Sequence, residues 1–222
     1  MKITYFGHAC FLLETKEGTR ILIDPFNEQV GYPIPRVEAD LVLISHEHFD
    51  HNHLPMAAGS PKVIRGLAND GRDFAEVSET FRDVKISAIP TYHDETQGSQ
   101  RGKNAMFCIE GNAVKVLHAG DLGHDLDNAA ARAARNPDIL MIPVGGHYTI
   151  DAKTADSVID RLRPRVVIPM HYKTEVNGDW PIATLDGFLQ GKRGITRVGH
   201  RVKALPLPDQ REVWVMDWKE KA

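Results

Sequence analysis

Cysteine is scarce in this chain of 222 residues, which contains only Cys10 and Cys108. Small secreted domains that depend on disulfides carry more cysteines than this, so a disulfide scaffold is excluded. Both residues lie inside apolar runs, where a free thiol packs like a small hydrophobic side chain. We therefore predict two buried thiols in a reducing compartment.

Long apolar runs are absent as well, and none approaches the roughly 20 residues needed to cross a bilayer. Residues 1–5 enter an alternating, strand-like pattern rather than the apolar core and cleavage site of a signal peptide. These observations predict a cytoplasmic protein with no membrane partner.

Positive charge is not in excess, because 27 lysines and arginines are set against 30 aspartates and glutamates. A nucleic-acid-binding surface is usually strongly basic, so no nucleic-acid partner is expected. The Gly-x-Ser-x-Gly motif of a nucleophile elbow is also missing. An activated serine is therefore not the expected source of any hydrolytic chemistry.

Histidine, in contrast, is abundant, with 11 residues spread along the whole chain. Many of them follow apolar runs that read as strands. Strand-like patterns cover residues 3–5, 11–14, 21–25, 40–46, 62–65, 84–90, 106–110, 113–117, 139–144, 166–169 and 211–218. Gly111-Asn112 is a typical two-residue hairpin signal.

Helical patterns are fewer and lie mainly in the second half of the chain. Helices are predicted over residues 126–135, 151–162 and 182–190, with a short one over 67–76. Strands and helices alternate without a linker or a repeat, which predicts a single α/β domain over residues 1–222.

The sharpest motif is Ser45-His46-Glu47-His48-Phe49-Asp50-His51, which directly follows a buried strand. Imidazole and carboxylate groups are good ligands for zinc and similar divalent ions. A tight turn after the strand would direct His46 and His48 at one ion, and Asp50 and His51 at a second. Such a site needs further ligands from elsewhere in the chain.

Three more ligand-type residues also stand just after apolar strands: His93, Asp121 and His171. Strand ends that meet on one edge of a sheet hold side chains rigidly, as a catalytic metal centre requires. One histidine or aspartate at a strand end is usually a turn residue, but the complete set favours a metal site.

The order of these motifs resembles the metallo-β-lactamase fold, in which Ser-His-x-His-x-Asp-His is followed by a strand-end His, a Gly-Asp and a Pro-x-His. The resemblance implies a four-layer αβ/βα sandwich. It also implies His46, His48 and His93 at a first metal, Asp50, His51 and His171 at a second, and Asp121 as the bridge.

The opening Tyr-Phe-Gly-His-Ala-Cys-Phe of residues 5–11 is similar to the lactonase-like branch, which includes ascorbate-phosphate lactonase. That branch has serine after the third metal histidine, and this chain has Asp94-Glu95 instead. Neighbours along a strand face opposite sides, so one carboxylate is expected at the mouth of the site. It would disfavour phosphorylated substrates.

Several residues beside these motifs have candidate roles. Asp50 is a candidate proton acceptor, and His8 or His147 a candidate for assisting the leaving group, with Tyr172 as a further substrate contact. His118 is expected to pack or to orient a ligand, and His124 either to do the same or to bind metal. His53 and His200 are expected at surface or structural positions.

Two divalent ions, with zinc favoured and manganese or iron as alternatives, would lower the pKa of a bound water to roughly 7. The metal-bound hydroxide would then hydrolyse a small-molecule ester, lactone or phosphoester. The alternatives are a phosphodiesterase or nuclease, and a non-catalytic or redox di-metal protein. Oxygen-reducing members of the superfamily carry glutamate where this chain has His48, which favours hydrolysis. A homo-oligomer is a possible assembly.

Overall fold

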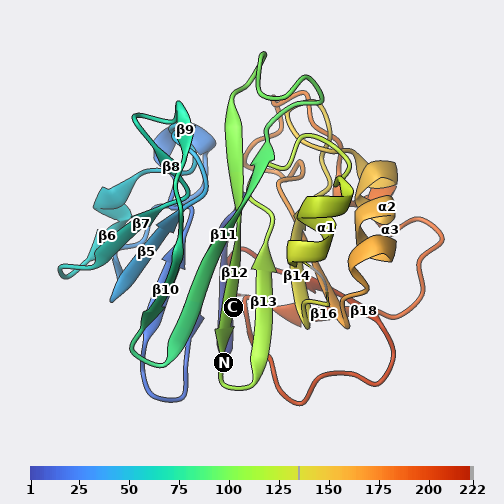
Figure 1. Cartoon of the computed structure of the whole chain (residues 1–222). Helices are drawn as coiled ribbons and strands as arrows, with labels where there is room; N and C mark the ends of the chain where they lie inside the picture. The colour runs from blue at the N-terminus through green and yellow to red at the C-terminus, as the bar shows by residue number, and fades with distance from the viewer. Residues whose placement is uncertain (135, 221–222) are drawn as a thin grey trace.

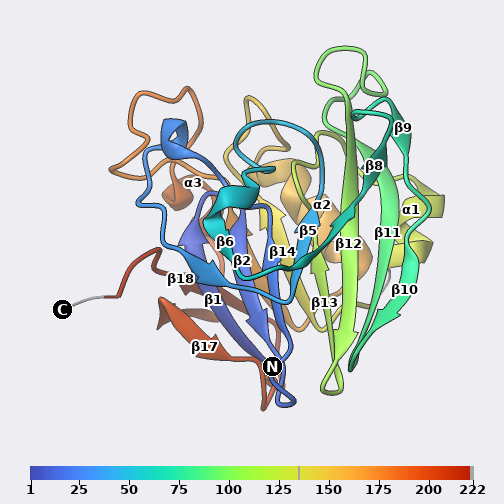
Figure 2. The ribbon, with the colours of Figure 1, turned by 90° about the vertical axis from the view of Figure 1, so that its left-hand side faces the viewer.

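Two β-sheets stacked face to face form the centre of the molecule, as the computed structural model shows for residues 1–134 and 136–220 (Figures 1 and 2). The smaller sheet contains, in spatial order, β17 (Arg201–Lys203), β1 (Lys2–Gly7), β2 (Cys10–Glu14), β3 (Arg20–Ile23), β5 (Leu41–Ile44) and β7 (Lys62–Arg65).

The larger sheet has its own order of eight strands. These are β10 (Ser78–Phe81), β11 (Val84–Tyr92), β12 (Lys103–Gly111), β13 (Val114–His118), β14 (Ile139–Pro143), β15 (Val166–Met170), β18 (Glu212–Met216) and β16 (Ile195–Gly199). Two small pairs complete the strands: β4 (Val37–Glu38) with β6 (Ala57–Ala58), and β8 (Leu67–Ala68) with β9 (Asp73–Phe74).

The alternation of side chains along the strands of the smaller sheet explains how this sheet is buried on both faces. In β2, Phe11 and Leu13 join the main core between the sheets, whereas Cys10 and Leu12 join a second apolar cluster on the opposite face. The same alternation recurs in β3 and β5. A strand that is apolar at every position, such as β5, is therefore expected for a sheet covered on both sides.

Helices cover the outer face of the larger sheet: α1 (Asn128–Ala134), α2 (Ala152–Leu162) and α3 (Leu185–Leu189) (Figure 1). The apolar side chains of α2 recur at helical spacing and are buried against the sheet, and the Asp151 carboxylate caps its N-terminus by accepting from the Thr154 N–H at 2.8 Å. The outer face of the smaller sheet is instead covered by residues 26–39, which include the 3₁₀ turn η1 (Glu28–Val30), and by the 3₁₀ turn η2 (Leu54–Met56).

The predicted α/β sandwich is confirmed, and most predicted strands are present. The hairpin between β12 and β13 is also present, but its two turn residues are Asn112 and Ala113, with φ of 51° and 59°. The helix predicted over 126–135 begins at Asn128, and residue 135 lies outside the described residues. The helix predicted over 182–190 is limited to α3.

The short helix predicted over residues 67–76 is wrong. This segment forms the antiparallel pair of β8 and β9, because Asn69, Asp70 and Gly71 have left-handed φ values of 51°, 55° and 83°. Three consecutive left-handed residues do not fit a right-handed helix, but they do fit a tight reversal.

Both cysteines are free and buried, as predicted. Within residues 1–134 and 136–220, no helix has the length and apolar character needed to span a membrane.

Stability is expected to depend strongly on Leu140, which is fully buried in β14 at the centre of the larger sheet. Leu140→Ala should lower the free energy of unfolding by about 2–5 kcal/mol, because it leaves a cavity that the strand cannot fill. Urea denaturation of metal-free protein measures this change. Lys85→Ala, an exposed position in the same sheet, is the control and should change stability by less than about 0.5 kcal/mol.

Candidate metal centre

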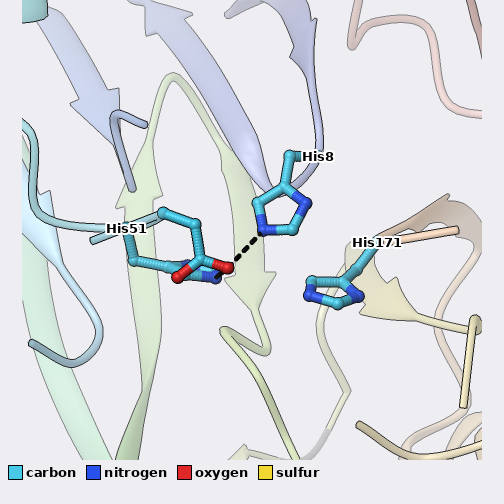
Figure 3. Close-up of side chains that lie close together, drawn as sticks. His8, His51 and His171 are labelled. Atoms are coloured by element: carbon cyan, nitrogen blue, oxygen red, sulfur yellow. Dashed lines mark hydrogen bonds and ion pairs between the residues drawn. The ribbon is translucent and has the colours of Figure 1, made fainter. Parts of the chain in front are cut away.

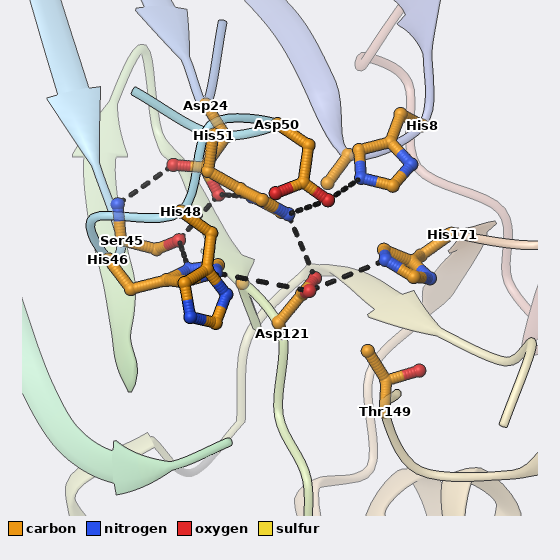
Figure 4. A network of polar contacts seen from close by, with 12 residues as sticks. His8, Asp24, Ser45, His46, His48, Asp50, His51, Asp121, Thr149 and His171 are labelled. Carbon is orange, nitrogen blue, oxygen red and sulfur yellow. Dashed lines mark hydrogen bonds and ion pairs between the residues drawn. The ribbon is translucent and has the colours of Figure 1, made fainter. Parts of the chain in front are cut away.

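Seven ligand-type side chains from distant parts of the chain meet at one end of the two sheets, and Figure 4 labels all of them except His93. Each one stands just after a strand, in the turn or loop that follows it. The residues are His46, His48, Asp50 and His51 after β5, His93 after β11, Asp121 after β13 and His171 after β15. The strand ends thus place these side chains on the rigid part of the fold.

The first group consists of His46, His48 and His93, whose ring nitrogens are close enough to share one ion. His46 Nε2 lies 3.1 Å from His48 Nδ1, and His93 Nε2 lies 3.2 Å from Asp121 Oδ2. His46 and His93 are buried, whereas His48 is exposed on the open side.

The second group consists of Asp50, His51 and His171, together with His8 from the turn between β1 and β2 (Figure 3). Asp50 Oδ2 lies 3.0 Å from His8 Nε2 and 3.8 Å from His51 Nε2. The backbone N–H of His171 donates to the carbonyl of His8 at 2.9 Å, which ties the two sheets together at the site.

Asp121 lies between the two groups. Its Oδ2 is 3.2 Å from His93 Nε2 on one side and 3.3 Å from His171 Nε2 on the other, and its Oδ1 is 3.2 Å from His51 Nε2. The structure thus brings together all seven residues that the sequence suggested as ligands, and it adds His8 to the second group.

Unsatisfied polar atoms show that this donor set fits metal ions. His51 Nε2 and Asp121 Oδ1 are buried and have no hydrogen-bond partner within residues 1–134 and 136–220, although they face each other. A buried polar atom without a partner is costly, and a shared cation removes that cost. Histidine and carboxylate donors at this spacing are the ligands that zinc and similar ions prefer.

The electrostatics of the first group and of Asp121 also suit a cation. Burial lowers the pKa of His46 well below its usual value, and the neighbouring His51 adds to this effect. Burial likewise lowers the pKa of His48, which His93 lowers further. Imidazoles that resist protonation keep the lone pair that metal binding needs. Burial opposes the ionisation of Asp121, but His171 and His51 hold the pKa of its carboxyl well below the usual range.

Asp24 orients the ligands from behind, a role that the sequence reasoning missed. Its buried carboxylate accepts from the Ser45 N–H at 2.8 Å, from the Ser45 hydroxyl at 2.6 Å and from His51 Nδ1 at 2.9 Å. Ser45 Oγ in turn lies 2.9 Å from His46 Nδ1. These contacts leave Nε2 of both histidines facing the site. Asp24 directly follows β3, just as the ligands follow their own strands. Its position at a strand end could therefore have identified it in the sequence as part of the site.

The two outlying catalytic candidates differ in their positions. His8 is 1% exposed and contacts Asp50, so it belongs to the centre. His147 is exposed and lines an adjoining pocket of about 290 Å³. Tyr172 is buried in the main core, where burial raises the pKa of its hydroxyl.

The remaining histidines have structural contacts. His118 Nε2 lies 2.8 Å from the carbonyl oxygen of Ala9, and His124 Nε2 accepts from the Tyr92 N–H at 3.0 Å. His200 packs edge-on against the Phe6 ring at 5.8 Å, and His53 precedes the η2 turn.

A cavity of about 700 Å³ opens onto both groups and is large enough for a small organic molecule. Besides the ligands His48, Asp50, His93, Asp121 and His171, its lining includes Gln29, Glu47, Phe49, Gln100, Arg101, Tyr148 and Trp180.

The expectation that Asp94-Glu95 would place a carboxylate at the mouth of the site is not met in the cavity that opens onto the ligands. Asp94 is 4% exposed and its carboxylate bonds the loop that follows it. Asp94 and Glu95 both line the adjoining pocket, which shares His93, Gln100, Arg101 and Tyr148 with the cavity, but neither residue is part of the cavity lining itself. The chain leaves β11 at Tyr92 and turns immediately, so the strand alternation on which the expectation depended does not apply.

Comparisons with known proteins agree with this geometry. Residues 2–171 match the model of the β-lactamase superfamily domain. A UPF0173 metal-dependent hydrolase of Nanoarchaeum equitans is 32% identical over an alignment 232 positions long, which covers 96% of this chain and 99% of the relative. A UPF0173 metal-dependent hydrolase of Thermococcus onnurineus is 32% identical and covers 84% of this chain and 88% of its own length.

A solved structure extends the similarity to the whole fold. The crystal structure of a Zn-dependent hydrolase of the metallo-β-lactamase superfamily from Thermotoga maritima is 39% identical, with a TM-score of 0.78 and 97% of each chain covered. The fold, the strand-end ligands and these relatives lead to the same assignment. The chain belongs to the metallo-β-lactamase superfamily and, within it, to the UPF0173 family of metal-dependent hydrolases.

Proposed function

We propose that this protein is a binuclear hydrolase that cleaves a small ester, lactone or phosphoester. The observation that carries the proposal is the position of Asp121, whose two carboxylate oxygens face ligand histidines of both groups at 3.2–3.3 Å. A carboxylate in this position is suited to bridge two ions. The similarity of residues 5–11 to the lactonase-like branch supports a lactone among the candidate substrates.

The first ion would be held by His46, His48 and His93, the second by Asp50, His51 and His171, and both by Asp121. We propose zinc, because nitrogen-rich donor sets suit it, with manganese or iron as alternatives. Bound divalent ions supply an activated water and polarise the oxygen of a carbonyl or phosphoryl group.

The protein's own residues would handle the proton. Burial, reinforced by His171, lowers the pKa of His8 to about 4, so this imidazole is neutral near pH 7. Its contact with the Asp50 carboxylate at 3.0 Å places the remaining proton on Nε2, which then donates to Asp50 Oδ2. We infer that Asp50 accepts a proton during hydrolysis and that His8 orients its carboxylate. His147 has no assigned step, because it does not line the cavity.

The size of the cavity supports a small-molecule substrate rather than a nucleic acid. A redox di-metal protein is the alternative from another class. His48 stands where oxygen-reducing superfamily members carry glutamate, which favours hydrolysis. A di-iron redox protein absorbs visible light as purified, whereas a zinc hydrolase is colourless.

Metal content provides the first test. Elemental analysis of protein reconstituted with zinc should give close to two ions per chain, because two ligand groups share Asp121. A stoichiometry that stays below one after reconstitution would rule out the binuclear centre.

Ligand substitution separates the centre from nearby histidines. His48→Ala or Asp121→Ala should lower the rate of metal-dependent ester hydrolysis by more than about 100-fold, beyond the usual effect of residues that only support ligands. His53→Ala is the matched control, since His53 makes no side-chain capping bond and does not line the cavity. Equal loss of activity in the His53 and Asp121 variants would contradict the ligand assignment.

Asp24 tests the support behind the ligands through metal affinity. Asp24→Asn keeps the shape but removes the charge that accepts from His51 and Ser45. Zinc affinity, measured by competition with a chromophoric chelator, should fall about 10- to 100-fold. An unchanged affinity would mean that Asp24 stabilises the fold and not the ligand geometry.

A further inference from the structure

Residues 94–102 form a loop that is folded around one buried carboxylate, that of Asp94. Oδ1 accepts from the Thr96 N–H at 2.8 Å, the Thr96 hydroxyl at 2.7 Å and the Gly98 N–H at 2.9 Å. Oδ2 accepts from the Gln100 N–H at 3.0 Å and the Arg101 N–H at 2.7 Å. Burial opposes ionisation, but these bonds, that from Arg101 foremost, hold the pKa of Asp94 well below its usual range.

The ends of this loop are joined to each other and to a metal ligand. The Gly102 N–H donates to the carbonyl of Gly98, and the His93 N–H donates to the carbonyl of Gly102, both at 3.0 Å. Gly98 has a φ of 81°, and a Cβ there would come within 2.8 Å of the Gly102 carbonyl oxygen. These hydrogen bonds hold the backbone of the loop in one conformation, which places Arg101 at the cavity that opens onto the ligands.

Arg101 is the one lysine or arginine in the described lining of that cavity. Its guanidinium carbon lies 5.8 Å from the centre of the Tyr148 ring. No carboxylate of residues 1–134 and 136–220 is within ion-pair distance of it. The carboxylates of the cavity have other partners, since Glu47 binds Arg65 at 2.6 Å, and Asp50 and Asp121 contact histidines. The Arg101 guanidinium is thus a positioned cation with free donors.

Three aromatic side chains, those of Phe49, Tyr148 and Trp180, also line the cavity. Phe49 is 44% exposed, and the Trp180 ring lies 6.0 Å from that of Tyr148 and 5.4 Å from that of His8. A large exposed aromatic side chain at a cavity is typical of a surface that receives an apolar ligand group.

We propose that Arg101 binds a carboxylate of the substrate that is remote from the bond that is cleaved. The apolar part of the substrate between this carboxylate and the scissile bond would pack against the aromatic side chains of the cavity. This inference rests on the proposed hydrolytic function. A single guanidinium matches one carboxylate in charge and in its two-pronged hydrogen bonding. A phosphate dianion carries two negative charges, and the described lining has no second lysine or arginine to balance them.

Two esters with the same scissile bond provide the kinetic test: mono-4-nitrophenyl adipate, which ends in a carboxylate, and its neutral methyl ester. The wild type should show a higher kcat/KM for the carboxylate ester. In Arg101→Gln, the ratio of the two values should fall about 10- to 100-fold, mainly through KM, as expected for a lost hydrogen-bonded ion pair. Arg101→Lys should retain part of the preference.

The substitution leaves the loop intact, because Asp94 bonds the backbone N–H of residue 101 and not its side chain. Arg193→Gln is the matched control, because it removes the same charge from an exposed residue that does not line the cavity. It should leave the ratio unchanged.

A binding measurement separates this proposal from the proposed hydrolysis. Adipate and hexanoate have six carbons each, but only adipate has a second carboxylate for Arg101. Calorimetry on the zinc-loaded wild type should show tighter binding of adipate, and Arg101→Gln should abolish the difference. If neither ester is cleaved but this difference in binding is found, Arg101 binds a carboxylate as proposed, and the proposed ester hydrolysis is wrong. If both esters are cleaved with equal kcat/KM and adipate binds no better than hexanoate, the Arg101 proposal is overturned and the hydrolase remains.

Discussion

A buried carboxylate among imidazoles is the constraint on which the rest of this structure depends. Asp121 is 1% exposed, and three histidine nitrogens lie within 3.3 Å of its oxygens. An isolated charge in such a place is very costly, so its partners must be held closely in position. Strand ends provide that rigidity, because the hydrogen bonds of two stacked sheets fix where each turn begins.

The supporting contacts extend this constraint outward into both sheets. Asp24 connects the end of β3 to Ser45 and His51 after β5, so two neighbouring parallel strands share one carboxylate. Asn104, on β12, accepts from the Asp121 N–H at 2.9 Å and donates to the carbonyl of Ala119 at 3.0 Å. Because the ligand loops after β5 and β13 are held by these contacts, the site can keep many polar groups buried without losing its shape.

Asp94 shows how the same residue type serves a different purpose beside the centre. Its carboxylate is satisfied by the N–H groups of its own loop, so it contributes geometry rather than charge to the cavity. Arg101, seven residues further along the chain, is the one lysine or arginine in the described lining of the cavity.

Much of the fold and the ligand set could be predicted from the sequence because the signals are local. Buried strands such as β5 and β14 are apolar at every position, and each predicted ligand stands in the turn or loop that follows a strand. Where the local signal was ambiguous, it misled: the 67–76 segment has no strand-length apolar run, and left-handed backbone at Asn69 and Asp70 decides its shape.

Contacts between distant segments could not be predicted in this way. Tertiary structure alone decided that Asp121 lies between two ligand groups, that Asp24 supports His51, and that Arg101 rather than Glu95 lines the cavity. The sequence by itself determined which side chains stand at strand ends, because side-chain patterning along a strand is local. Which of them face one another depends on how two sheets stack and on where each loop finds its hydrogen bonds, and no short stretch of sequence contains that information.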